Sequence, residues 1–324
     1  MMPHILLAGK LHPAGLALLK SASGFTFSHI EEISEDSYAP LIGDADAIVI
    51  RTQPMTAATI AAAKKLKIVS RHGVGYDAVD VEALTRRDIP LTIVGDVNSN
   101  AVAEHTMMLI LAASRRLNRS EHAVRKGHWA WRNAFEASEI SGKHLLIIGY
   151  GRIGRHIARM ALAFGMSVSA YDPYLAAQGW PEGVVQCERT LDVALSRSDI
   201  VTVHVPRTDH PILGVNELSQ IKQGGIVINT ARGGLIDEAA LAAAIRDGHI
   251  GAAGFDVFDA EPPKHDHPLM GLDQVILTPH NAALTKECAE RMAVASVQNV
   301  LDYFAGRLNP ALVVNKVHSL SRAS

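Results

Sequence analysis

The sequence predicts an α/β protein built from two doubly wound parallel sheets with helices on their faces. Short apolar runs alternate with amphipathic segments along most of the chain, which is the pattern of strands and helices in such sheets. A glycine-rich turn near residue 150 opens a second series of the same alternation. The chain has 324 residues, which is enough for about two domains.

The composition narrows the class of protein further. Hydrophobic residues make up 48% of the chain and charged residues 20%, which is ordinary for a globular protein and excludes a disordered one. A net charge of −2 predicts neither a nucleic-acid nor a membrane partner, because both need a concentrated basic patch. Two cysteines are too few for a disulfide framework, and the first apolar run is too short for a signal peptide, so we expect a cytoplasmic protein.

Four apolar runs in the first hundred residues predict buried strands. They cover residues 4–9, 46–50, 67–73 and 90–94. The stretches between them have helical spacing and cover residues 13–22, 56–66 and 81–88. A long helix is expected next, over residues 100–127. Because its first half is apolar on most sides, this helix should be buried between domains or subunits.

Six further apolar runs from residue 144 onward suit a second doubly wound sheet. They cover residues 144–149, 167–172, 200–205, 225–230, 252–258 and 275–280. The stretch 281–310 predicts one long helix that ends near Gly306 and Pro310. This rhythm alone predicts a first domain of about 100 residues and a second of about 185.

Three glycines between the first of these strands and the next helix have the spacing G-x-G-x-x-G. Gly149 allows a tight turn out of the strand, Gly151 lets the backbone approach a pyrophosphate, and Gly154 lets the helix pack close to the strand. The N–H groups at the helix start would then face the phosphates. A glycine turn without any ligand is the alternative, but the strand–turn–helix context favours dinucleotide binding.

Asp172 ends the second strand of this unit, 18 residues after the last glycine. Its carboxylate can accept hydrogen bonds from an adenosine ribose, whereas a 2′-phosphate would meet a like charge. No Arg or Lys follows until Arg189. The sequence therefore favours NAD over NADP, although Asp172 could also be a turn residue before Pro173.

Three candidate reacting groups follow later apolar runs directly: Arg232, Glu261 and His280. Ligands of open α/β sheets gather outside the carboxyl ends of the strands, where these residues are expected. Arg232 suits a carboxylate or carbonyl oxygen, and His280 could exchange a proton near neutral pH. Glu261, if hydrogen-bonded to the imidazole, would orient it and favour its charged form. Each residue alone could be an ordinary loop residue, but their joint appearance after one glycine unit favours a catalytic set.

At this point the chain resembles the D-isomer-specific 2-hydroxyacid dehydrogenases, the family that includes D-3-phosphoglycerate dehydrogenase and glyoxylate/hydroxypyruvate reductase. The resemblance extends over nearly the whole chain, through residues 71–80, 98–111, 141–154, 204–210, 228–245, 251–263, 267–282 and 309–315. The segments around Arg232, Glu261 and His280 are long and specific. The resemblance implies an NAD-dependent oxidoreductase that transfers a hydride between NAD(H) and a small D-2-hydroxy or 2-keto acid.

The resemblance also implies a role for individual residues. The family's catalytic arginine, glutamate and histidine fall on Arg232, Glu261 and His280. Its substrate loop, whose backbone N–H groups hold a carboxylate, falls on His72, Gly73, Val74 and Gly75. Its cofactor contacts fall on Gly149, Gly151, Arg152, Ile153, Gly154, Asp172, Thr208, Thr230, Ala231 and Asp256, with Asp256 at the position that contacts the nicotinamide carboxamide.

The domain organisation follows from the same resemblance. It implies a flavodoxin-like substrate-binding domain over residues 1–98 plus 286–324, and a Rossmann NAD-binding domain over residues 99–285. The active-site cleft would lie between them, with hinges near Asn98 and Ala283. The helix from Ala101 matches the family's dimerisation region, so we expect a homodimer.

The sequence leaves the identity of the 2-hydroxy acid open. Arg51 lies where phosphoglycerate dehydrogenases carry an arginine for the substrate phosphate, but Gln53 replaces a second basic residue found in some of them. Hydroxypyruvate and glyoxylate therefore stay candidates beside 3-phosphoglycerate. An NAD-sensing, corepressor-like binding protein could keep the same three catalytic residues. A formate dehydrogenase would pair its histidine with a glutamine instead of Glu261.

No metal site is expected. The segment 264–267 offers two histidines and an aspartate, but no further ligands follow at a recognised spacing. Cys187 and Cys288 lack histidine partners nearby in the sequence, so we expect inert thiols.

Overall fold

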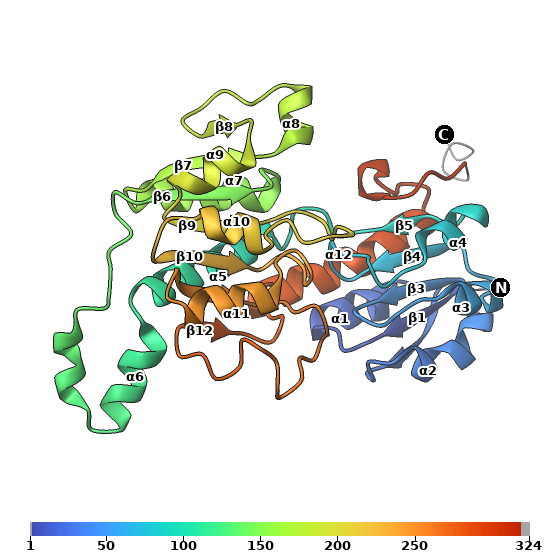
Figure 1. The fold of residues 1–324 in the computed structure, drawn as a ribbon. Coiled ribbons are helices and arrows are strands. Elements are labelled where there is room, and N and C mark those ends of the chain that lie inside the picture. The colour runs from blue at the N-terminus through green and yellow to red at the C-terminus, as the bar shows by residue number, and fades with distance from the viewer. Residues whose placement is uncertain (1, 319–324) are drawn as a thin grey trace. The chain divides into compact units, whose positions relative to one another are not determined.

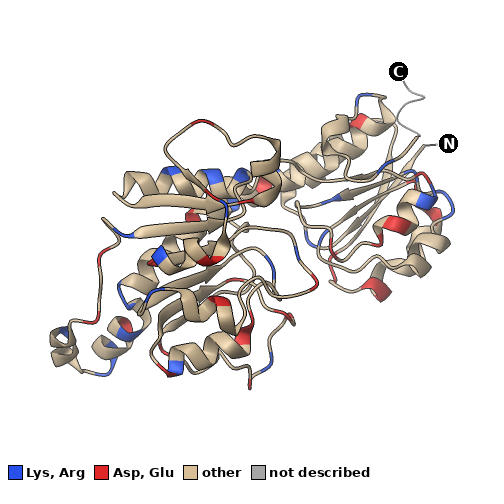
Figure 2. Cartoon of the chain, turned by 45° about the horizontal axis from the view of Figure 1, so that its top comes forward, with Lys and Arg blue, Asp and Glu red and all other residues tan. Residues whose placement is uncertain are grey.

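The computed structural model describes residues 2–318 of the chain (Figure 1). The chain separates into two compact units, Met1–Asn98 with Leu284–Ser324, and Ser99–Ala283. Each unit contains a parallel sheet with helices on its faces, which confirms the predicted fold class. Basic and acidic residues are interspersed over both units (Figure 2). Within residues 2–318, no helix has the length and apolar character needed to cross a membrane.

The first unit is built on a parallel sheet with the strand order β2-β1-β3-β4-β5. Its strands are β1 (His4–Ala8), β2 (Thr26–Ile30), β3 (Ala47–Ile50), β4 (Ile68–Arg71) and β5 (Leu91–Thr92). Its helices are α1 (Pro13–Ser21), α2 (Glu35–Tyr38), α3 (Ala57–Ala62), α4 (Val81–Arg86), α12 (Lys286–Phe304) and the 3₁₀ turns η1 (Ala39–Asp44) and η3 (Pro310–Leu312).

Alternate residues of β1 point to opposite faces of this sheet, as the period of a strand requires. Ile5 and Leu7 pack with Leu19 of α1 and Val297 of α12. Leu6 belongs to the buried cluster on the other face, with α3, α4 and η1. Both faces are therefore covered around β1, which explains why this strand reads as a continuous apolar run.

The second unit is built on a longer parallel sheet with the order β12-β11-β10-β9-β6-β7-β8. Its strands are β6 (His144–Ile148), β7 (Ser167–Tyr171), β8 (Gln186–Glu188), β9 (Ile200–Val203), β10 (Gly225–Asn229), β11 (Ile250–Phe255) and β12 (Val275–Leu277). Its helices are α5 (Ser99–Ser114), α6 (Leu117–Arg125), α7 (Arg152–Ala163), α8 (Pro173–Gln178), α9 (Leu191–Arg197), α10 (Val215–Gln220), α11 (Glu238–Arg246) and the 3₁₀ turn η2 (Trp129–Ala134).

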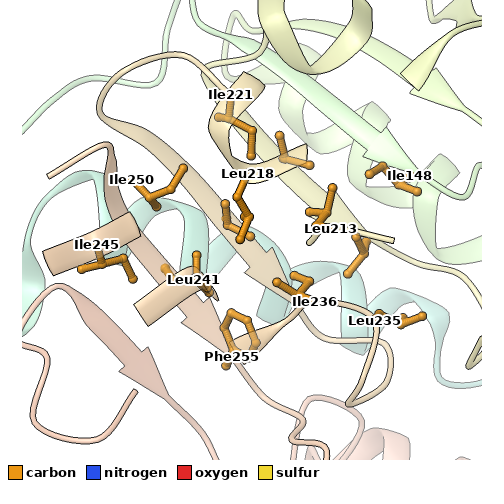
Figure 3. Packing of buried hydrophobic residues seen from close by; sticks show 14 of the residues in the cluster. Ile148, Leu213, Leu218, Ile221, Leu235, Ile236, Leu241, Ile245, Ile250 and Phe255 are labelled. Atoms are coloured by element: carbon orange, nitrogen blue, oxygen red, sulfur yellow. The ribbon is translucent and has the colours of Figure 1, made fainter. Parts of the chain in front are cut away.

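The faces of the second sheet carry separate buried clusters. One cluster joins Leu146 to side chains of α9, α10 and α11, including Leu218 and Leu241 (Figure 3). The other joins Leu145 and Ile147 to α5 and α7. Both clusters lie between strand and helix layers, so the loops after the strands are held at one rigid edge of the sheet.

The prediction of one helix over residues 100–127 is wrong. α5 ends at Ser114 and α6 begins at Leu117, because Arg116 has a left-handed backbone with φ +52°. The N–H of Ser138 donates to the carbonyl of Ser114 (2.9 Å), and the Arg116 guanidinium donates to the carbonyl of Gly251. These tertiary bonds satisfy groups at the break and stabilise it, and the sequence rhythm does not contain them.

The last long helix starts later than its apolar pattern predicts. α12 begins at Lys286, and the side chain of Thr285 caps it by accepting the N–H of Cys288 at 3.1 Å. The N–H groups of Asn281 and Ala282 instead donate to the carboxylate of Asp256. The residues before Thr285 therefore form a loop at the sheet edge, and this loop carries His280.

Candidate active site

The glycine loop lies between β6 and α7, at the carboxyl end of the second sheet. Gly149 has φ +96°, and a Cβ there would lie 2.4 Å from the carbonyl oxygen of His204. Gly154 is equally confined, because a Cβ there would lie 2.4 Å from the carbonyl oxygen of Gly149. Both glycines are therefore required by close packing of the chain on itself.

Gly151 is different, because a Cβ at this position would meet no atom within 4 Å. Its missing side chain leaves one side of the loop open. Arg152 and Ile153 follow as the first turn of α7, where helix N–H groups have no partner within the helix. The positive end of the helix dipole attracts anionic groups to this place. The loop thus fits the pyrophosphate of a dinucleotide.

Asp172 connects the end of β7 to this loop. One carboxylate oxygen accepts the N–H of Tyr150 at 3.0 Å, and the other accepts the N–H of Leu175 at 2.9 Å. The residue therefore caps α8, as the turn interpretation expected, and also lies beside the glycine loop, as the ribose interpretation requires. Since a carboxylate oxygen can accept more than one hydrogen bond, a ribose contact stays compatible with this geometry.

His280 and Glu261 form a direct contact at the same edge of the sheet. Nδ1 of His280 lies 2.7 Å from Oε2 of Glu261, and Oε1 accepts the N–H of Phe258 at 3.0 Å. Burial alone would raise the pKa of the Glu261 carboxyl. Hydrogen bonds from His280 and Phe258, together with the charge of Arg232, lower that pKa below its ordinary value. Glu261 is thus a carboxylate at neutral pH.

The backbone of His280 is left-handed, with φ +49°, and Asp256 holds it there. The carbonyl of Asp256 accepts the N–H of His280 at 2.8 Å. The two carboxylate oxygens of Asp256 accept the N–H groups of Asn281 (3.0 Å) and Ala282 (2.9 Å). Asp256 is completely buried. The structure thus gives Asp256 a part in fixing the His280 loop, while its contact with a carboxamide stays a prediction.

Asn229, at the end of β10, fixes the segment of Arg232. Its Oδ1 accepts the N–H of Ala231 at 3.1 Å, and its Nδ2 donates to the carbonyl of Arg232 at 2.8 Å. Asn229 is completely buried, and Thr230 is 6% exposed. Asn229 was not among the residues expected at the site, although a polar residue that closes a wholly apolar strand is a signal of this role.

Gly233 brings the arginine loop against the glutamate loop. A Cβ on Gly233 would lie 1.9 Å from the carbonyl oxygen of Phe258. No side chain fits there, so the residue after Arg232 packs against Phe258, the residue whose N–H binds Glu261. Arg232, Glu261 and His280 therefore meet within one unit, although about fifty residues separate the first from the last.

Thr208 lies in an exposed turn after β9. Its hydroxyl donates to the carbonyl of His210 at 2.7 Å. The neighbouring Arg207 pairs with Asp259 at 2.6 Å, on the loop after β11. The Arg207–Asp259 ion pair thus joins this turn to the loop after β11, close to Gly234. A contact between Thr208 and a cofactor stays a prediction.

The predicted substrate loop belongs to the first unit, where it follows β4. His72 is 5% exposed, and the N–H of Gly73 donates to the carbonyl of Arg71 at 2.9 Å. Burial and the charges of Arg51 and Arg71 lower the pKa of His72 to about 4. Val74 and Gly75 are partly exposed beside it. The loop is thus a positively charged environment around a neutral imidazole.

Arg51 follows β3 in the same unit, and its Nη1 donates to the carbonyl of Lys10 at 3.3 Å. Burial lowers the pKa of Arg51 from its ordinary value. Gln53 is 1% exposed, and its Nε2 donates to the carbonyl of Glu32 at 3.2 Å. Its amide nitrogen is therefore used inside the fold, and this neutral side chain supplies no second positive charge beside Arg51.

His267, from the segment that suggested metal ligands, has a structural partner. Its Nε2 lies 2.7 Å from Oε2 of Glu238, and Oε1 of that glutamate accepts the N–H of Asp259 at 3.0 Å. In the described part of the chain, no group of three or more His, Cys, Asp or Glu side chains is arranged to hold a metal ion.

Comparison with known proteins decides the family. The family model described as "D-isomer specific 2-hydroxyacid dehydrogenase, NAD binding domain" matches residues 107–282. The chain belongs to this family. The match covers the glycine loop, Asp172 and the three residues Arg232, Glu261 and His280, so the second unit carries the NAD-binding domain of a D-isomer-specific 2-hydroxyacid dehydrogenase.

Relatives within the family differ in their named activities. The D-3-phosphoglycerate dehydrogenase of Mycobacterium bovis is 39% identical over 316 residues, which cover 96% of this chain and 59% of the relative. The hydroxypyruvate reductase of Thermotoga maritima is 36% identical over 275 residues, which cover 83% of this chain and 88% of the relative. The chain thus spans less than two thirds of the first of these proteins.

Solved structures of the family share the fold. The NADPH-dependent glyoxylate/hydroxypyruvate reductase of Sinorhizobium meliloti has a TM-score of 0.82 and 30% identity, with 98% of each chain covered. A formate dehydrogenase of Staphylococcus aureus with NAD bound has a TM-score of 0.86 but only 24% identity, so it shows the fold alone.

Proposed function

We propose that the chain catalyses NAD-dependent hydride transfer between NAD(H) and a small D-2-hydroxy or 2-keto acid. The 2.7 Å contact between His280 Nδ1 and Glu261 Oε2 is the observation that carries this proposal. It joins the imidazole of His280 to the carboxylate of Glu261, whose pKa the charge of Arg232 also lowers. All three residues lie in a domain of the NAD-binding type. This combination supplies an anion-binding group and a proton donor together.

Each residue has one task in the reducing direction. When bound, the reduced nicotinamide supplies the hydride to the carbonyl carbon of the substrate. Arg232 binds the substrate carboxylate and polarises the carbonyl oxygen. Because Nδ1 of His280 is used by Glu261, Nε2 is the atom that donates a proton to the developing alkoxide. In the oxidising direction Nε2 accepts that proton.

Glu261 supports both directions. Its carboxylate keeps the imidazole ring in one orientation and stabilises the imidazolium by charge. The Phe258 N–H holds the other oxygen of that carboxylate. Positioned proton transfer of this kind contributes about 10²–10⁴-fold to the rate. The cofactor contacts predicted for Gly149, Gly151, Gly154 and Asp172 complete the site.

The substrate class that we propose is a D-2-hydroxy acid, or the matching 2-keto acid, of three carbons or fewer, with or without a phosphate. The names of the relatives point to 3-phosphoglycerate, hydroxypyruvate and glyoxylate. Arg51 and Arg71 lie near the predicted substrate loop of the first unit, which favours an additional anionic group. The phosphorylated substrate is therefore the first to test.

We further propose a homodimer in a reducing compartment such as the cytoplasm. Around α6 and η2, four apolar side chains are exposed: Leu117, Val124, Trp129 and Phe135. Cys187 and Cys288 are both free thiols. Light scattering coupled to size-exclusion chromatography tests the dimer, and substitution of Trp129 and Phe135 by Ser should shift the mass toward the monomer.

A panel assay tests the activity. The purified chain is given NADH or NADPH with phosphohydroxypyruvate, hydroxypyruvate or glyoxylate, and cofactor oxidation is followed at 340 nm. We expect turnover with NADH for at least one acid. If NADH binds in a fluorescence titration but no 2-keto acid is reduced, the NAD-sensing binding protein replaces the dehydrogenase.

A further inference from the structure

A partly buried series of hydrogen bonds supports the His280 loop, with the buried Asp256 at its end. Thr278 precedes His280 by two residues, and its hydroxyl lies 2.6 Å from Oδ1 of Asp256. Nε2 of His105, on α5, lies 3.0 Å from the same hydroxyl and 3.6 Å from Oδ1 of Asp256. The hydrogen bonds therefore run from α5 through Thr278 to the carboxylate that accepts the N–H groups of Asn281 and Ala282, directly after His280.

The direction of these bonds follows from the chemistry of their atoms. The Thr278 hydroxyl has one proton, and its contact with the Asp256 carboxylate is much shorter than its 3.4 Å contact with the carbonyl of Phe255. That proton therefore goes to Asp256, and His105 must donate from Nε2. Burial lowers the pKa of His105 more than the Asp256 charge raises it, so the ring is a neutral donor.

The same turn of α5 also supports the arginine loop. The hydroxyl of Thr106 donates to the carbonyl of Val102 at 2.8 Å, so the hydroxyl of Thr230 donates to Thr106, also at 2.8 Å. Thr230 precedes Arg232 by two residues. Consecutive residues of one buried helix thus contact the bases of the two loops that carry Arg232 and His280.

We propose that His105 is a positioning residue of the reaction, which acts through Thr278 and Asp256 to hold His280 in its left-handed conformation. The inference rests on the proposed role of His280. His105 touches no reacting atom in this scheme. Without its N–H, the Thr278 hydroxyl and the Asp256 carboxylate lose their fixed orientation, and the loop of His280 relaxes out of its sparsely populated conformation.

Two pairs of variants test the chain. H105L removes the donor, whereas H105Q keeps an amide N–H at a similar distance along the side chain. T278V removes the hydroxyl at constant shape, whereas T278S keeps it. E104Q, on the exposed neighbour in α5, is the control. The measurements are kcat, the Kd of NADH from fluorescence, the melting temperature, and the isotope effect with NADH deuterated at the transferred position.

We expect H105L and T278V to lower kcat by about 10- to 100-fold, because small displacements of a catalytic group have effects of this size. The Kd of NADH should stay within about twofold, and the isotope effect should rise as the chemical step becomes slower. H105Q and T278S should recover most of the lost rate. H105L/T278V should be no slower than the slower single variant, because the two residues belong to one chain of bonds.

Three results would overturn the proposal. One is wild-type kcat in H105L or T278V. The second is a loss of kcat in H105Q equal to that in H105L, because it shows that the N–H donor is not what matters. The third is fully additive losses in the double variant, because they show that His105 and Thr278 act independently. H280A is measured in parallel. If H280A keeps full activity, the proposed function of His280 fails, whereas a slow H280A with a fast H105L rejects only the role of His105.

Discussion

The carboxylate of Asp172 accepts the backbone N–H of Tyr150 across 3.0 Å, so the acid at the end of β7 is bonded to the middle of the glycine loop. The same carboxylate caps α8 through Leu175. One side chain therefore fixes the geometry of both segments expected to hold the adenosine half of the cofactor. This double role determines how substitutions at position 172 must be designed.

Asp172→Ser should separate the two roles. A serine hydroxyl can still cap α8. The free energy of unfolding should therefore change by less than the cost of losing a cap, which is about 0.5–2 kcal/mol. The negative charge is lost, so kcat/KM with NADH should fall about tenfold and the discrimination against NADPH should weaken. Steady-state kinetics with both cofactors measure this. An unchanged ratio of kcat/KM with NADH to kcat/KM with NADPH would exclude Asp172 from cofactor selection. Asp172→Ala should show the same kinetic change and, in addition, the stability loss from the missing cap of α8.

Gly151→Ala should weaken NADH binding without changing stability, whereas Gly154→Ala should lower the stability of the fold. At Gly151 the new methyl group enters open space, so the melting temperature should hold while the Kd of NADH rises about tenfold or more. At Gly154 the methyl group would lie 2.4 Å from the carbonyl oxygen of Gly149, so the variant should lose at least about 1–3 kcal/mol of stability. Calorimetry and NADH titration distinguish the two. Normal NADH affinity in Gly151→Ala would contradict a pyrophosphate at this loop.

His280→Ala should lower kcat by about 10²–10⁴-fold and leave the Kd of NADH nearly unchanged. The imidazole transfers a proton in the proposed reaction but does not bind the cofactor. His265→Ala, at an exposed histidine on the loop after β11, is the matched control and should behave like the wild type. Single-turnover kinetics under saturating NADH provide the rate. Equal rates in the two variants would remove His280 from the mechanism.

The buried imidazole of His72 should make stability depend on pH. Its pKa is lowered to about 4 by burial and by the charges of Arg51 and Arg71, whereas an unfolded histidine has a pKa of 6.5. The unfolded chain therefore binds the proton more readily, and stability should fall as the pH decreases from 6.5 toward 4. The effect at position 72 amounts to at most about 3 kcal/mol.

His72→Gln tests this by removing the titrating group. The melting temperature of the variant should decrease less than that of the wild type between pH 7 and pH 4.5. His122→Gln, at an exposed histidine of α6, should leave the slope unchanged. Parallel curves for the wild type and His72→Gln would show that His72 is not buried in its neutral form.

The sequence predicted the strands that helices cover on both faces, because a strand buried in this way must be apolar throughout. It missed β2 and β8 because both are mostly partly exposed and contain polar residues. It predicted a continuous helix through Arg116, because the carbonyl of Gly251 and the N–H of Ser138 that stabilise the break come from distant segments.

The candidate site shows the same division. Arg232, Glu261 and His280 could be proposed because each follows an apolar run at the edge where strand ends gather. Their supports could not, because Asn229 and Thr278 act through bonds to backbone atoms and to a side chain of α5. A chain position shows that a residue is near the edge of a sheet but does not show which of its neighbours holds it.

The contact of Gly233 with the Phe258 carbonyl has a mechanical consequence. The arginine loop packs directly on the glutamate loop, because the two backbones touch without an intervening side chain. Under the proposed function, the guanidinium and the carboxylate–imidazole pair are therefore expected to keep their spacing while ligands are exchanged. On that expectation, any flexibility comes from segments outside this edge, and the proposed acid–base groups need no reassembly between one cycle and the next.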